Sequence, residues 1–114
     1  MEYMLLLHVD ESGWPKLTKA EQDQGMAAYR AYTEALKAAG VYRSGSQLQP
    51  SASGKTIRLA GGKPQVLDGP YADVREQVGG YYLIETPDLE SALSWAGRCP
   101  TVGHGVVEVR QLVG

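Results

Sequence analysis

The chain has 114 residues, of which 43% are apolar and 21% charged, and its formal net charge is −2. This length and composition are typical of one globular domain, here residues 1–114, and exclude a disordered chain. Scattered lysines and arginines in an acidic chain argue against direct nucleic acid binding. The single cysteine, Cys99, excludes an intrachain disulfide, and with only His8 and His104 beside it we expect no metal site and no cofactor.

The N-terminal segment lacks the features of a membrane or secreted protein. Its longest apolar run, Met4 to Leu7, is far too short to span a membrane. The Met1-Glu2 start has no basic region of the kind that opens a secretory signal. We therefore expect a cytoplasmic protein without membrane contact.

Residues 3–9 alternate in a way that predicts a strand. One face carries Tyr3, Leu5, Leu7 and Val9, and the other carries Met4, Leu6 and His8. Because both faces hold apolar groups, we expect this strand to be covered on both sides.

A first helix is predicted over residues 18–39. Thr18 followed by Glu21 is a capping-box pattern, and Gly40 is a natural C-terminal stop. At 100° per residue, one side of this helix gathers the mainly apolar set of Met26, Ala28, Tyr29, Tyr32, Thr33, Leu36 and Ala39. We expect an amphipathic helix that lies on a sheet.

The rest of the chain predicts short strands and a second helix. Strands are expected at 41–48, 56–60, 65–67, 77–85 and 106–112, with a turn at 61–64. Thr86 as N-cap and Pro87 at the first helical position predict a helix that ends near Gly97-Arg98. Its predicted apolar side consists of Leu89, Ala92, Leu93, Trp95, Ala96 and Cys99.

This element order predicts an α+β domain of the ferredoxin-like type. The order is βαβ, an inserted β-hairpin and a second βαβ, which gives an antiparallel sheet with two helices on one face. The other sheet face then needs a cover. Its apolar residues on the first strand favour a homodimer, joined sheet face to sheet face.

The segment Asp68-Gly-Pro-Tyr-Ala-Asp-Val-Arg-Glu76, with its continuation to Glu85, resembles the signature of the Asp-Gly-Pro-Phe branch of the YCII-related family. Three further pieces agree with this resemblance: residues 3–7, 45–50 and 98–110. The resemblance covers almost the whole chain and implies a dimeric α+β barrel.

The wider YCII-related family is associated with a histidine on the first helix and an aspartate before a proline that follows the second helix. In this sequence the helical region offers Ala28, Tyr29 and Tyr32, and Cys99 precedes Pro100. The resemblance therefore does not carry that pair over to this chain.

Glu108 and Arg110 are two residues apart on the last strand and share a face, opposite Val107 and Val109. If the valines pack under the helices, the charged pair points to the dimer side. Arg110 could then hold a carboxylate substrate while Glu108 orients it. The alternative is an ion pair with a structural role only.

Asp68 precedes the turn residues Gly69-Pro70, where its carboxylate could simply bond backbone amides. Under the functional interpretation, the turn presents Asp68 to a small pocket together with Glu76. Two carboxylates can divide acid and base roles when their environments separate their pKa values.

His104 lies between glycines before the last strand, where an imidazole could act as a general base or proton shuttle. Asp68 and His104 are thus the candidate catalytic residues, against the simpler interpretation of an exposed loop histidine. His8 shares its face with Met4 and Leu6 and approaches the dimer interior. It is a candidate for substrate binding or, alternatively, an interface histidine.

Two functions remain open from the sequence, together with a scaffold that has no ligand. The first is binding or transformation of a small anionic organic molecule in a barrel cavity, as by a lyase or isomerase; the fold argument for it is analogy. The second is a non-catalytic regulatory module. The resemblance implies a sigma factor of the extracytoplasmic-function type as its partner. Whether the protein is an enzyme is left undecided.

Overall fold

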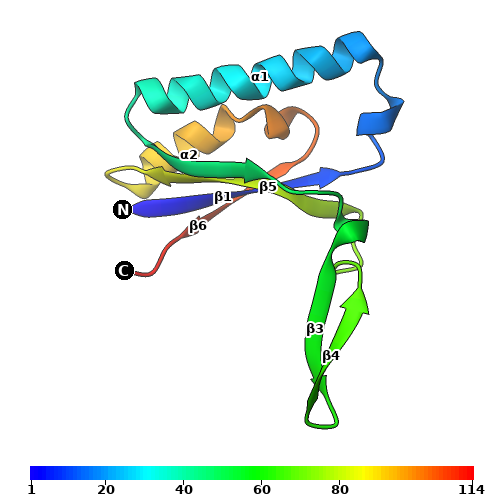
Figure 1. Cartoon of the computed structure of the whole chain (residues 1–114). Coiled ribbons are helices and arrows are strands. Elements are labelled where there is room, and N and C mark those ends of the chain that lie inside the picture. Colours follow the sequence, from blue (N-terminus) through cyan, green and yellow to red (C-terminus); the bar gives the residue numbers. More distant parts are fainter.

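The computed structural model describes all residues 1–114 and has one four-stranded antiparallel sheet, two α-helices and a separate hairpin (Figure 1). The elements are β1 (Glu2–Asp10), α1 (Lys19–Ala38), β2 (Tyr42–Gln47), β3 (Lys55–Ala60), β4 (Lys63–Asp68), β5 (Glu76–Glu85), α2 (Leu89–Gly97) and β6 (Val106–Gln111). The sheet order β2-β5-β1-β6 with both helices on one face confirms the ferredoxin-like prediction.

The central strand β1 separates the two faces of the sheet. Tyr3, Leu5 and Leu7 are almost fully buried under the helices, together with Leu36 and Ile84. The alternate residues belong to what we call the open face, because no other part of the chain covers it (Figure 1). By strand register the open face comprises Met4, Leu6, His8, Glu76, Val78, Tyr81, Leu83, Val106, Glu108 and Arg110.

The α1 helix begins at the predicted capping box. Thr18 accepts a bond from the Glu21 amide at 3.1 Å, and the Glu21 carboxylate accepts one from the Thr18 amide at 2.9 Å. The predicted apolar side includes residues that do not face the sheet, because Met26, Ala28 and Ala39 are exposed. The N-terminal half of this long helix extends past α2, and there it lies beside the turn at Trp14–Lys16 instead (Figure 1).

The predicted N-cap of α2 is wrong. Asp88, not Thr86, caps the helix: its carboxylate accepts a bond from the Ser91 amide at 2.8 Å. Thr86 is buried, and its hydroxyl donates to the Asp88 carbonyl instead. Leu89 and Leu93 are half exposed, contrary to the prediction. The helix approaches the sheet through small residues, and the two leucines fall at the edge of that contact.

Ala92 and Ala96 are the small residues of α2 that face the core, where they lie beside the buried Cys99. Tyr32 from α1 packs edge-on against Trp95 and donates its hydroxyl to the Trp95 carbonyl at 2.7 Å. The two helices are thereby joined by one aromatic contact and one hydrogen bond. Neither helix is long and apolar enough to cross a membrane.

The β3–β4 hairpin, hereafter the arm, projects from the open side of the sheet, at a steep angle to it (Figure 1). Its turn is shorter than predicted: only Gly61 and Gly62 form it, both with positive φ, and Lys63 and Pro64 already belong to β4. Two successive residues with positive φ suit the twist of a tight hairpin, and glycine adopts this conformation without steric cost.

Gly105, just before β6, lies very close to the backbone of β1 at His8. A Cβ at this position would clash with the carbonyl oxygen of His8, whereas a Cβ at Gly103 would meet nothing within 4 Å. We expect Gly105→Ala to lower the free energy of unfolding by roughly 1–3 kcal/mol, because backbone must move. Gly103→Ala should leave it within about 0.5 kcal/mol of wild type or raise it slightly. Urea denaturation of both variants measures this, and equal stabilities would contradict the described β1–β6 contact.

Candidate functional site

A chain of three charged or ionisable side chains crosses the open face. His8 Nε2 lies 3.0 Å from Glu108 Oε1, and Arg110 Nη1 lies 3.4 Å from Glu108 Oε2. One carboxylate thus contacts an imidazole through one oxygen and a guanidinium through the other. The rest of the nearby face is largely apolar, which makes this group chemically distinct.

The register of the sheet places these residues together. In the β1–β6 pair, His8 lies opposite Val106 and Leu6 lies opposite Glu108. His8 and Glu108 are therefore diagonal neighbours on one face, a separation that long side chains can bridge. Arg110, opposite Met4, continues the row toward the other end of β6.

A shallow, open depression of about 410 Å³ lies beside the imidazole. Its lining residues are His8, Val74, Glu76, Val106 and Glu108. The valines supply apolar walls, while the two glutamates and the histidine supply the polar groups. Three of the four residues predicted to bind substrate thus line one depression, and the fourth, Arg110, is ion-paired to its Glu108.

The hydrogen bonds around Glu108 determine the protonation states there. The bond from His8 lowers the pKa of the Glu108 carboxyl, and the bond from Arg110 lowers it further. An ionised carboxylate only accepts hydrogen bonds, so the Nε2 atom of His8 must carry the proton that it shares with Glu108. In the neutral imidazole, Nδ1 then has a free lone pair that can accept a proton.

Asp68 lies away from this group, at the root of the arm. Its carboxylate pairs with Lys55 Nζ across the hairpin at 2.6 Å and is 86% exposed. The carboxylate bonds Lys55 and not the backbone amides of the turn. Asp68 also does not line the depression to which Glu76 belongs. The sequence pattern around the turn gives no information on the direction in which the arm leaves the sheet.

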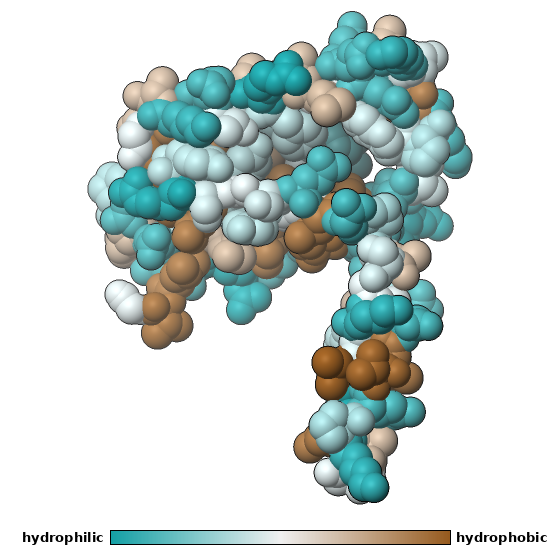
Figure 2. Space-filling view, viewed as in Figure 1, coloured by the Kyte–Doolittle hydropathy of each residue, from teal (hydrophilic) through white to brown (hydrophobic).

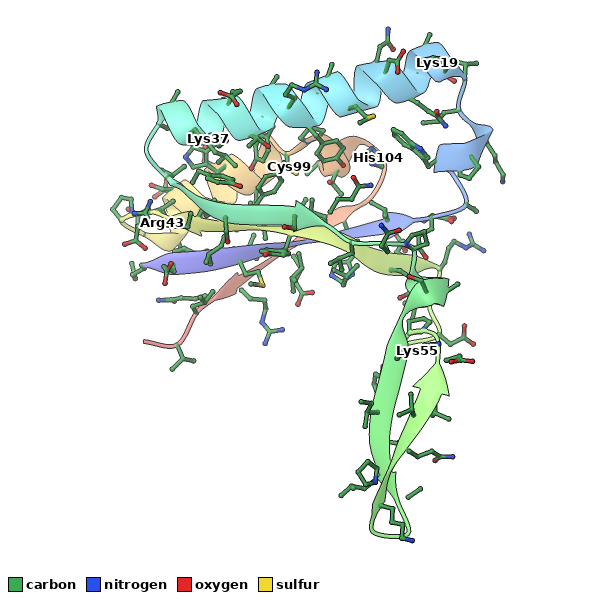
Figure 3. The ribbon with its side chains drawn as sticks, viewed as in Figure 1. Lys19, Lys37, Arg43, Lys55, Cys99 and His104 are labelled. Carbon is green, nitrogen blue, oxygen red and sulfur yellow. The ribbon has the colours of Figure 1, made fainter.

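His104 lies on the helix side of the sheet, not on the open face (Figure 3). Its Nε2 is 3.3 Å from the hydroxyl of Tyr29, which in turn is 2.6 Å from Thr101 Oγ1. Cys99 Sγ is 3.6 Å from the same threonine oxygen. Burial raises the pKa values of both the Tyr29 hydroxyl and the Cys99 thiol, so both stay protonated near neutral pH.

The alternation of residues in the sequence places His8 and Glu108 on the side expected to face a second copy, but it does not predict their contact. The only sign of their proximity in the sequence was that both residues fall on the same face of their strands. The contact itself needs the register between strands about a hundred residues apart, and a single sequence does not provide that register. Val74 gave no signal at all, because it lies in the irregular connection before β5.

Comparison with known proteins defines the family. The model of the YCII-related domain matches residues 1–114. The chain belongs to the YCII-related family. An uncharacterized protein of Rhizobium meliloti (strain 1021) is 37% identical to this YCII-related protein over 118 residues, which cover 98% of this chain and 92% of the relative.

Among solved structures, the YCII-related protein is similar to 5-chloro-2-hydroxyhydroquinone dehydrochlorinase of Burkholderia phenoliruptrix, in a complex with 2,5-dihydroxybenzoquinone. The TM-score is 0.55 at 18% sequence identity, and the match covers 99% of this chain and 94% of the other. At this identity the similarity establishes the shared α+β fold, namely a four-stranded antiparallel sheet with two helices and a hairpin.

The pKa of Glu108 offers a direct test of the charged group. We expect a carboxyl pKa below the ordinary glutamate value in the wild type and a rise toward that value in His8→Leu, which removes the main hydrogen-bond donor. A pH titration of the side-chain carboxyl carbon by NMR measures both. A wild-type pKa at or above the ordinary value would contradict the described contacts.

The same shift predicts how stability depends on pH. Because folding lowers the pKa of Glu108, its ionised carboxylate stabilises the folded protein above the unfolded-state pKa, and this contribution is lost as the pH falls through the folded-state pKa. The stability difference between wild type and Glu108→Gln should therefore shrink on acidification. Urea denaturation of both proteins over a series of pH values measures this difference, and a difference that grows on acidification would contradict the described contacts.

Proposed function

We propose that this YCII-related protein binds a small anionic organic molecule of the hydroxyquinone type on its open face. The observation that supports this is the charged row of His8, Glu108 and Arg110 beside a depression with apolar walls. Binding sites for small molecules commonly combine apolar walls with a few converging polar groups.

Arg110 is the residue proposed to hold the anionic oxygens. Only its Nη1 atom contacts Glu108, at a rather long 3.4 Å, and the side chain is 69% exposed. The remaining N–H groups of the guanidinium are therefore free to donate to two oxygens of a ligand at once. Glu108 limits the orientations of the guanidinium before the ligand arrives.

His8 is proposed to exchange a proton with the bound molecule. Glu108 fixes the imidazole by accepting the Nε2 proton, which leaves Nδ1 as the acceptor. The imidazole is 25% exposed, so a ligand in the depression can reach it. A carboxylate that orients an imidazole and stabilises its protonated form is a common arrangement in general acid–base catalysis.

The ligand class is proposed from chemistry and supported by the structural relative. Hydroxyquinones ionise readily and are flat, which suits a guanidinium donor next to apolar walls. The dehydrochlorinase with the same fold was solved with 2,5-dihydroxybenzoquinone. A depression this open buries little of such a molecule, so we propose that a second copy of the chain, packed against the open face, completes the cover.

Calorimetric titration with 2,5-dihydroxybenzoquinone tests the proposal. We expect Arg110→Met to weaken binding about tenfold or more, since a charge-assisted hydrogen bond contributes roughly 1.5–3 kcal/mol. Arg30→Met is the matched control, because Arg30 is exposed on α1 and its guanidinium forms no hydrogen bond or ion pair within the chain. Unchanged affinity of Arg110→Met would count against the proposed site, and no binding by the wild type would refute the ligand class.

A further inference from the structure

The arm has one apolar and one mainly polar face. In the β3–β4 register, Ile57 lies opposite Val66 and Leu59 lies opposite Pro64, so these four side chains share a face. Ile57, Leu59 and Val66 are 67%, 72% and 60% exposed. Figure 2 shows these apolar atoms gathered midway along the arm, away from the body of the molecule.

Nothing within the same chain covers this apolar face. The radius of gyration is 16.0 Å, whereas a compact domain of this length has one of about 13 Å. A two-stranded hairpin alone in water is marginally stable, and exposed apolar strands invite association with other chains. The arm therefore has the character of a docking element.

The root of the arm is held firmly to the body. Glu11, just after β1, accepts hydrogen bonds from both the amide and the hydroxyl of Ser51, shortly before β3. The Gly69 amide donates to the Gly54 carbonyl at 2.8 Å, which closes the base of the hairpin. The direction of the arm is thus set in advance, so little ordering is needed when it docks.

Charge complementarity indicates what the arm docks on. Within residues 55–68 the arm carries Lys55, Arg58 and Lys63 against Asp68 alone, a net charge of +2. Since the whole chain has a net charge of −2, the remainder has −4. A basic arm is attracted to the acidic body of a second copy, and a twofold axis would place both arms in equivalent contacts.

The length of the arm indicates where it docks. Six residues of β-strand extend about 20 Å, while two sheets packed face to face lie about 10 Å apart. An arm of this length therefore reaches past an opposing sheet to the flank of the partner. We propose that the apolar face of each arm packs on the flank of a second copy of this chain, so that two copies clasp each other.

This arrangement has a consequence for the depression on the open face. The connection between the arm and β5 contains Val74, which lines the depression, and Gln77 holds that connection by donating to the carbonyls of Ala72 and Val74. Docking of the arm would immobilise one wall of the site. The proposed site is then completed only in the assembled pair.

Sedimentation velocity of the full chain without any ligand tests the arm. We expect a wild-type dimer and at least a tenfold weaker association of Ile57→Ser/Leu59→Ser, whose changes lie on the apolar face. Gln65→Ser/Leu67→Ser changes the opposite face without changing the charge of the arm and should remain dimeric. A monomeric wild type, or equal association of both double variants, would overturn the proposal.

Isotope-filtered NOEs in a mixed dimer of labelled and unlabelled chains provide a second readout that does not depend on the folding of a variant. We expect contacts between the methyl groups of Ile57 and Leu59 and the other copy. A dimer with contacts from the open face but none from the arm would refute the proposal that the arm packs on the second copy. An arm that binds only a different protein would refute it as well. Either result leaves the ligand proposal to its own test.

Discussion

The register of β1 between β5 and β6 is the constraint on which the rest of the molecule depends. It turns Tyr3, Leu5 and Leu7 toward the helices and His8 toward the open face. A slip by one residue would exchange the two sets and would bury the imidazole under α1. The same register gives His8 its diagonal contact with Glu108.

The sheet thereby separates two groups of polar side chains with different properties. On the helix side, Tyr29, Thr101 and Cys99 are linked by hydrogen bonds, and burial keeps the phenol and thiol protonated. On the open side, Glu108 is ionised and keeps contact with solvent. Only the open side therefore offers both a charged group and access for a ligand.

Local patterns in the sequence predicted most of the fold. The alternation in β1 and the capping box at Thr18 depend on residues within a few positions of one another, and both were confirmed. Thr86 failed as a cap because Asp88, two residues later, makes the bond to the helix amide. The exposure of Leu93 was missed because periodicity identifies an apolar side but not how closely a helix approaches its sheet.

The candidate site was less accessible from sequence. Same-face placement put His8, Glu108 and Arg110 on one side, yet their contacts depend on pairing between the two ends of the chain. The sequence did not show that Asp68 lies away from these three residues. The direction of the arm is determined by bonds at its root and not by the turn residues.

The most direct test of the central claim is a map of backbone and imidazole chemical shifts during titration with 2,5-dihydroxybenzoquinone. The account predicts the largest changes at His8, Val106, Glu108 and Arg110, on the open face. Changes centred on His104, or on the first turn of α2, would contradict it.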